Sequence, residues 1–395
     1  MRSRTPHGFS LLEVTTAMGI MMIVTAGVFS LMHPAHDAFA AQPEVADLQQ
    51  RLRVAADTLS RDLIMAGAGA PLGTQAGPLV SSFAPVLPFR QGATNDDPPG
   101  TFATDRITLI FVPSTAAQTR LTTDFTPASL TLQVAAGSSC PPYVNLCAFV
   151  EDMPVLVYDD QGNYDLFTIT SVIDGLMQLT VNTPADAANA TFPAGATVVE
   201  AASHTYYVKT DATTGISRLM HYDGTRNADV PVVDHLVGLA FEYFGEPVPP
   251  LLTKPVGEPA GPWTTYGPRP PALGVKPTAY PAGENCAFTI DGNGQQVPRL
   301  AVLGDGSPAL VPLTAVQLTD GPWCPDSSSA NRWDADLLRI RTVAVTLRVE
   351  TASAALRGPA SALFSNGGTS RGGSRWVPDQ ELRLQMAPRN LNLGR

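Results

Sequence analysis

The chain of 395 residues is short of charge, of lysine and of cysteine. Charged residues make up 15% of it, against roughly 25% in an average soluble domain. It has three lysines and four cysteines, and 35 acidic residues against 25 basic ones give a net charge of −10. This balance excludes a uniformly basic nucleic-acid-binding surface as the default. Only one apolar run of 18 or more residues occurs, near the N-terminus, so a multi-span membrane protein is excluded too.

The composition is nevertheless that of a folded protein. Hydrophobic residues are 44% of the chain, which is enough for a sizeable core, and 33 glycines with 36 prolines indicate many loops. The length predicts two to three domain-sized units.

The N-terminus carries the clearest pattern. Residues 1–8 are basic and free of acids, and residues 9–32 form an apolar stretch. As a helix this stretch is about 36 Å long, enough to cross a hydrocarbon core of about 30 Å. Arg2 and Arg4 precede it and no Lys or Arg follows until Arg51. The positive-inside rule therefore predicts one span, a cytoplasmic N-terminus and a large exported part.

Glu13 is the one charged residue inside this stretch. An acid in a spanning helix costs up to about 2.5–3.5 kcal/mol at the centre and less near an end, so Glu13 needs a partner. Residues 9–32 hold no Lys, Arg or His. The partner must come from another chain or from a newly made amino terminus.

The segment Gly8-Phe9-Ser10-Leu11-Leu12-Glu13 resembles the processing motif of type IV prepilins and of type II secretion pseudopilins. The resemblance implies that prepilin peptidase cuts between Gly8 and Phe9 and methylates Phe9. Glu13 then becomes the fifth residue and pairs with the free amine of a neighbouring subunit. Residues 48–69 are similar to the stem end of PilW-like minor pilins, and less closely to GspJ-like minor pseudopilins. The resemblance covers about residues 1–69 and is architectural beyond them.

The resemblance to these pilins implies a non-enzymatic minor pilin without cofactors, which is a structural and assembly subunit of a type IV pilus. Its partners would be prepilin peptidase, other minor and major pilins through the N-terminal helix, and the inner-membrane assembly platform. The chain would sit in the inner membrane with a periplasmic head, and later in the pilus or at the cell surface. A type II secretion minor pseudopilin is the alternative, and a filament-tip adhesin or DNA-uptake subunit is a further one. Loss of Arg2 and Arg4 with the leader changes the charge to −12, so no nucleic acid partner is expected.

Two other interpretations of the N-terminus stay open. Ala38-Phe39-Ala40 matches a secretory cleavage site before Ala41. Against it, the apolar run exceeds the roughly 7–15 residues of a secretory signal and contains an acid. A plain single-pass anchor is the second. The mature N-terminal residue distinguishes these cases.

The expected fold is α+β and pilin-like, with a long N-terminal helix and an antiparallel β head. Its parts are a leader (1–8), a transmembrane helix (9–33), an amphipathic stem helix (34–69), a β-rich region (70–246), a Pro-rich excursion (247–285) and a C-terminal β part (286–395). Pro34 and Pro43 are expected to interrupt the helix. Gly67 is expected to end the stem helix. The packed face of the stem is predicted from an apolar stripe, which consists of Val45, Leu48, Leu52, Ala55, Leu59 and Leu63.

Alternating and apolar runs predict the strands. They lie at 107–112, 130–134, 155–158, 165–170, 177–181, 205–209, 218–222, 236–244, 337–349 and 381–386. Those within about 148–200 are expected to form a small barrel-like insertion. The strand 337–349 changes its apolar phase, which predicts a β-bulge near Arg341 and Thr342.

The four cysteines allow three pairings. Proximity in the sequence favours Cys140–Cys147 and Cys286–Cys324, each pinning a Pro-rich loop in an exported, oxidising compartment. Zinc is disfavoured because no C-x-x-C occurs and no histidine is near a cysteine.

No catalytic or metal site is predicted. There is no H-E-x-x-H, Walker loop or G-x-G-x-x-G. Residues 368–372 match G-x-S-x-G formally, but no histidine follows His235 and the surroundings are Gly-rich. Asp159-Asp160 and residues 291–294 offer oxygen ligands for calcium without completing an EF-hand loop.

Overall fold

The computed structural model describes residues 9–70, 78–114, 117–137, 140–182, 191–225, 229–249, 267–268, 270–276, 280–326, 328–357 and 377–392, with backbone only at 31–41 and 355. The fold is α+β, with an N-terminal apolar helix and antiparallel sheets. The leader 1–8, most of the Pro-rich excursion and the G-x-S-x-G segment lie outside the described residues.

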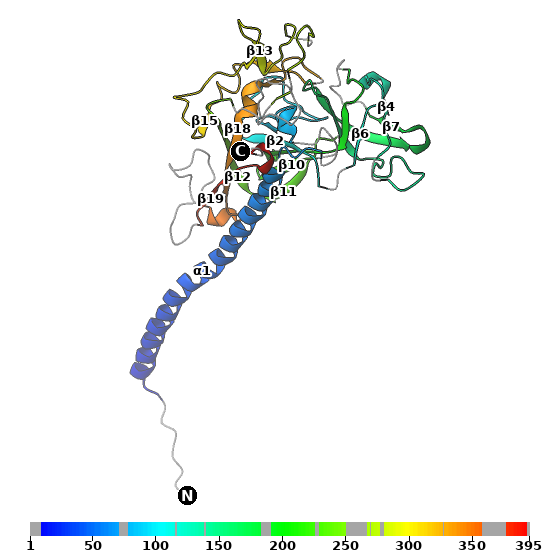
Figure 1. The fold of residues 1–395 in the computed structure, drawn as a ribbon. Coiled ribbons are helices and arrows are strands. Elements are labelled where there is room, and N and C mark those ends of the chain that lie inside the picture. Colours follow the sequence, from blue (N-terminus) through cyan, green and yellow to red (C-terminus); the bar gives the residue numbers. More distant parts are fainter. Residues whose placement is uncertain are drawn as a thin grey trace. The chain divides into compact units, whose positions relative to one another are not determined.

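A single helix, α1 (Leu11–Met65), replaces the two that were expected (Figure 1). Pro34 and Pro43 both lie inside it, so the prediction that they interrupt the helix is wrong. Each proline removes only one backbone donor, and helical pairing resumes on either side. The helix ends where predicted. Gly67 has φ +78°, and its N–H donates to the carbonyl of Ile110 over 3.0 Å.

The apolar stripe of the helix is buried. Leu48, Ala55, Leu59 and Leu63 have no exposed surface, and Leu52 is 8% exposed. Spacing of three and four residues places such side chains on one face of a helix, so periodicity predicted the packed face correctly.

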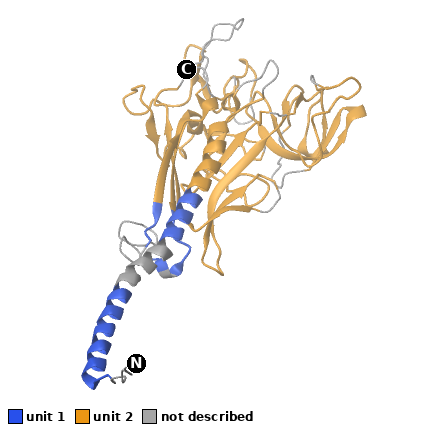
Figure 2. Cartoon of the chain, turned by 90° about the horizontal axis from the view of Figure 1, so that it is seen from below, with its two compact units in different colours: residues 1–52, 349–380 blue, residues 53–348, 381–395 orange. Residues whose placement is uncertain are grey.

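The chain divides into two compact units, coloured separately in Figure 2. One unit comprises Met1–Leu52 and Val349–Gln380, and the other Arg53–Arg348 and Glu381–Arg395. Within the first, Glu44 accepts hydrogen bonds from Thr351 Oγ1 (2.5 Å) and from the N–H of Ala352 (3.2 Å). These bonds lower the pKa of Glu44 although burial opposes the shift.

The second unit contains a five-stranded, a four-stranded and a six-stranded sheet. The five-stranded sheet has the order β1 (Val86–Leu87), β2 (Arg106–Phe111), β9 (Ala202–Thr210), β10 (Ser217–Tyr222), β11 (Val230–Asp234). The four-stranded sheet has the order β15 (Val311–Leu313), β12 (Leu236–Gly245), β18 (Ile340–Val349), β19 (Gln380–Met386). Short hairpins pair β13 (Phe288–Ile290) with β14 (Gln296–Pro298), and β16 (Trp323–Cys324) with β17 (Trp333–Asp334). The 3₁₀ helices are η1 (Leu79–Ser81), η2 (Pro127–Ser129), η3 (Asp174–Leu176), η4 (Ala335–Arg339), η5 (Ala354–Leu356) and η6 (Arg389–Leu391).

A six-stranded sheet closes on itself as a small barrel. Its order is β3 (Gln118–Arg120), β8 (Thr197–Glu200), β5 (Pro154–Tyr158), β6 (Tyr164–Ile173), β7 (Gln178–Val181), β4 (Thr131–Gln133). An antiparallel bridge between Leu121 and Val134 joins its first and last strands. Phe125, Phe167 and Phe192 pack together in its interior. The insertion therefore begins near residue 117 rather than 148, because the closing strands come from earlier in the chain.

The segment 337–349, expected as one strand, is divided between a 3₁₀ helix and a strand. The segment Ala335–Arg339 is the 3₁₀ helix η4, capped by Asp334, whose side chain accepts from the N–H of Asp336. Strand β18 starts only at Ile340 and is buried throughout except at Thr346. A strand covered on both faces need not alternate apolar and polar residues. Burial on both faces accounts for the phase change without the bulge predicted near Arg341 and Thr342.

Candidate functional site

The N-terminal end of α1 is an exposed apolar surface. Leu11–Ser30 has a mean hydropathy of 1.8 and none of it is buried, so by length and composition it is a candidate membrane span or signal sequence. Phe9 and Leu11 are each 86% exposed. Burying apolar surface is worth about 25 cal/mol per Å², so these side chains gain from lipid or from other helices. Gly8, on the other side of the expected cleavage point, lies outside the described residues.

Glu13 has a local partner in this structure. The N–H of Ser10 donates to Glu13 Oε2 (2.9 Å), and the N–H of Glu13 donates to Ser10 Oγ (3.2 Å). This reciprocal pair is a capping box, which satisfies two backbone donors at a helix start. The Ser-x-x-Glu spacing of residues 10–13 is the sequence signal for this motif. Glu13 can therefore both cap its own helix and present a carboxylate to another chain.

The four cysteines form two disulfides, Cys140–Cys147 and Cys286–Cys324. These are the pairs that proximity in the sequence favoured. Cys286–Cys324 links residues 38 positions apart, and Cys140–Cys147 residues seven apart. No thiolate is therefore left to bind a metal ion.

The aspartates considered as calcium ligands accept hydrogen bonds from the backbone of their own turns. Asp159 Oδ1 accepts from the N–H of Gln161 (2.8 Å) and of Asn163 (3.0 Å), in the hairpin between β5 and β6. Asp291 Oδ1 accepts in the same way from Asn293 (2.9 Å) and Gln295 (2.8 Å). Such turns need no ion, because the aspartate already pairs with backbone donors.

Asp62, His204 and His221 lie together in the second unit, and we call them the Asp–His cluster. Asp62 comes from the last turns of α1, His204 from β9 and His221 from β10. Asp62 Oδ2 lies 2.5 Å from His204 Nδ1 and accepts a hydrogen bond of 2.5 Å from Tyr206 Oη. The two imidazole rings are 4.4 Å apart and nearly perpendicular. His221 Nε2 is buried without a hydrogen-bond partner among the described residues.

The charge states in the Asp–His cluster follow from its contacts. Burial alone would raise the pKa of Asp62, but the hydrogen bonds from His204 and Tyr206 bring it below its ordinary value. Burial, together with the nearby His204, lowers the pKa of His221. At neutral pH the cluster therefore presents an ionised carboxylate and at least one neutral imidazole.

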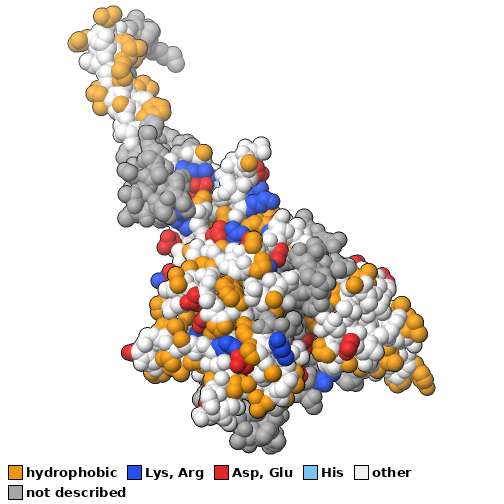
Figure 3. Space-filling model, turned by 90° about the horizontal axis from the view of Figure 1, so that it is seen from above, with side chains coloured by type: hydrophobic (Ala, Val, Ile, Leu, Met, Phe, Trp, Pro, Cys, Tyr) orange, Lys and Arg blue, Asp and Glu red, His pale blue; other side chains and the backbone are white. Residues whose placement is uncertain are grey.

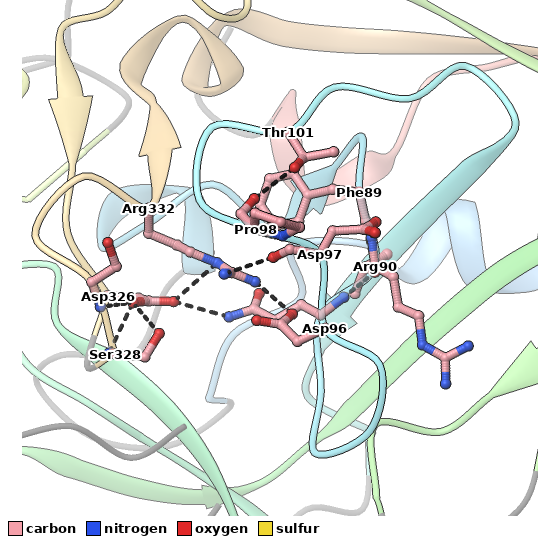
Figure 4. A network of polar contacts seen from close by, with 12 residues as sticks. Phe89, Arg90, Asp96, Asp97, Pro98, Thr101, Asp326, Ser328 and Arg332 are labelled. Carbon is pink, nitrogen blue, oxygen red and sulfur yellow. Dashed lines mark hydrogen bonds and ion pairs between the residues drawn. The ribbon is translucent and has the colours of Figure 1, made fainter. Parts of the chain in front are cut away.

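Arg332 is the centre of a second polar group, which we call the Arg332 network (Figure 4). This guanidinium is almost fully buried and donates to Asp96 Oδ1 (2.5 Å) and to the carbonyl of Asp97 (3.0 Å). Its Nε lies 3.4 Å from Asp326 Oδ2, and its face covers the ring of Phe89. The Arg332 network therefore fastens the loop after Phe89 to the loop between β16 and β17, and we assign it a structural role.

Asp334, at the start of η4, is a buried carboxylate with an unusual pKa. It accepts from the N–H of Gly321 (2.6 Å) and of Asp336 (2.7 Å). Burial nevertheless raises its pKa to about 7, and the nearby carboxylates of Asp336 and Asp320 act in the same direction. Asp320, Asp334 and Asp336 form an acidic cluster, in which one carboxylate oxygen of each residue lies within 4.8 Å of the other two.

The raised pKa gives an expected pH dependence. Between about pH 4 and pH 7 the folded protein holds a proton on Asp334 that the unfolded chain has lost, so this group's contribution to stability falls as pH rises through that window. Asp334→Asn should remove this part of the slope. Thermal unfolding of the detergent-solubilised chain from pH 4 to 8 measures it, with Asp57→Asn, an exposed carboxylate outside the acidic cluster, as the control. An unchanged slope in Asp334→Asn would contradict the assignment.

No model of a protein family matches the chain, and neither does any curated protein or solved structure that it was compared with. The sequence correctly predicted the disulfide pairs, and the roles of Phe9 and Glu13 stay predictions. It gave no sign of the Asp–His cluster or of the Arg332 network. Asp62 is 142 positions from His204, and Arg332 is 236 positions from Asp96, so no local spacing could reveal these contacts.

Proposed function

We propose that this protein is a minor pilin, a structural and assembly subunit of a type IV pilus that prepilin peptidase processes between Gly8 and Phe9. The observation that carries the proposal is the order of residues around the start of α1. The chain begins with a basic leader that ends in Gly8, and Phe9 follows. Glu13 lies five positions after the glycine, in the first turn of an exposed apolar helix. The head would be periplasmic before assembly and lie in the filament afterwards.

The physical basis is the fate of the exposed helix. In a membrane its apolar side chains contact lipid, and in a filament they contact sister helices. Glu13 lies about 6 Å along the helix from the amine that cleavage would create, so staggered neighbours can pair the two groups. The proposal needs no catalytic residue in the head.

The mature N-terminus tests the proposal. Protein purified from membranes and from sheared filaments should begin at N-methylated Phe9, as measured by mass spectrometry of the N-terminal peptide. A mature chain starting at Ala41 would mean that the helix is discarded with a secretory signal. A chain that keeps residues 1–8 in finished filaments would also refute it.

A type II secretion pseudopilin would give the same N-terminal peptide. Deletion of the gene separates the two functions: a pilus subunit affects piliation and motility, whereas a pseudopilin affects export of secreted proteins.

A binding subunit at the filament tip is favoured by one observation. The barrel carries exposed apolar residues near the Cys140–Cys147 loop, where the N–H of Asn145 donates to Asp174 Oδ1 (2.7 Å) and so joins two turns. These turns expose Tyr143 fully, Leu176 by 61% and Met177 by 40%. Large exposed apolar groups are typical of protein-binding surfaces. On the face seen in Figure 3, acidic and basic side chains are interspersed, which gives no support to capture of DNA.

A further inference from the structure

We propose that the Asp–His cluster is a zinc-binding site that joins the last turns of α1 to the five-stranded sheet. The ligands would be the carboxylate of Asp62 and one imidazole nitrogen each of His204 and His221. This inference is independent of the proposed pilus function, because it depends only on groups within the second unit.

Backbone geometry brings the three residues to one place. His204 and Tyr206 are two positions apart on β9, so their side chains leave the sheet on the same face. His221 on β10 is directly opposite Tyr206 in the antiparallel register, which puts it on that face as well. Asp62 reaches the same face from α1, as its hydrogen bonds to His204 and Tyr206 require.

The spacing suits a metal ion. One ligand atom of each residue lies within 4.8 Å of the other two. Ligands about 2.1 Å from a tetrahedral ion are about 3.4 Å from one another. Asp62 and His204 are closer than this, at 2.5 Å, so an ion would enter by displacing the proton that they share and moving them apart by about 1 Å. That proton passes to solvent.

The donor set indicates which ion. Two imidazoles and one carboxylate, with water as a fourth ligand, form a common zinc environment. Calcium and magnesium prefer oxygen ligands, and thiolate sites are unavailable since the cysteines are paired. The His204 side chain is 23% exposed, which gives an ion access from solvent.

Two further features distinguish this cluster from an ordinary hydrogen-bonded triad. The buried His221 Nε2 has no hydrogen-bond partner in the part of the chain that the structure describes, and buried polar atoms are normally paired. A bound ion would give the His221 imidazole a partner. Tyr206 Oη donates to Asp62 and so orients the carboxylate, as a residue just outside the ligand shell commonly does.

The test uses the full chain in detergent, stripped with chelator and titrated with zinc chloride by isothermal calorimetry. We expect one ion per chain, with a dissociation constant of about 10 µM or tighter. Zinc X-ray absorption should show nitrogen and oxygen ligands only. Absence of binding at 1:1 stoichiometry, or sulfur in the ligand shell, would overturn the proposal.

Variants locate the ion. His221→Phe keeps a ring in the sheet. Without zinc it should unfold at the wild-type temperature or above, since it removes a buried nitrogen that no described residue pairs with. It should bind zinc at least about 100-fold more weakly, and Tyr206→Phe about 10-fold more weakly. Asp57→Asn, an exposed carboxylate on the same helix, is the matched control and should bind normally. Wild-type affinity in His221→Phe would overturn the site.

Discussion

Replacing Glu13 by valine is expected to abolish incorporation of the protein into filaments while its insertion into the membrane survives. This expectation rests on the proposed function. Removing one partner of a buried ion pair costs about 3–5 kcal/mol, which is a loss of roughly 100- to 4,000-fold in an assembly equilibrium. The measurement is the amount of the protein in sheared filaments relative to that in membranes, by immunoblotting.

The capping box provides the control that separates the two roles of Glu13. Glutamine can accept the same hydrogen bond from the N–H of Ser10 but carries no charge. If the carboxylate pairs with a neighbouring amine, Glu13→Gln should fail to assemble as Glu13→Val does. Ser10→Ala should lose only about 1 kcal/mol of helix stability and still assemble. Normal filaments from Glu13→Gln would mean that capping alone explains the residue.

Replacing Arg332 by methionine is expected to destabilise the second unit by about 3–5 kcal/mol. The substitution keeps the apolar contact with Phe89 but leaves the buried Asp326 and the half-buried Asp96 without their cation. In thermal unfolding we expect a drop of about 10 °C. The drop should be larger at pH 8 than at pH 5, because protonation of the unpaired Asp326 relieves part of the cost.

Two further variants keep this experiment informative. Arg332→Lys retains the charge but not the planar fork of donors. Its unfolding temperature should therefore lie between those of the wild type and Arg332→Met. Arg383→Ala removes an arginine paired with Glu242 at the surface, where the two side chains are 58% and 53% exposed. Exposed pairs contribute under about 1 kcal/mol, so this control should unfold near the wild-type temperature. Equal effects of Arg332→Met and Arg383→Ala would contradict the role assigned to the Arg332 network.

The sequence predicted features whose information is local. The apolar run at the N-terminus, the stripe from Leu48 to Leu63 and the stop at Gly67 depend on neighbours a few residues away. Strands such as β2, β5 and β10 were placed to within a residue or two for the same reason. The α+β class follows from these elements alone.

The prediction failed where a local pattern had two explanations. Two prolines suggested an interrupted helix, yet α1 continues through both. The apolar pattern suggested one strand over 337–349, whereas an aspartate-capped 3₁₀ helix occupies Ala335–Arg339 and the strand begins at Ile340. In each case the rest of the fold selects between alternatives that the sequence leaves nearly equal in energy.

The sequence by itself determined the apolar helix with its lone acid at residue 13, because helical periodicity and charge are written in consecutive positions. Only the tertiary structure decided that residues 117–134 close the barrel, that Arg332 meets Asp96, and that Asp62 meets His204 and His221. These contacts join segments far apart in the chain, and strand register sets which side chains face one another. No spacing in the sequence carries that register.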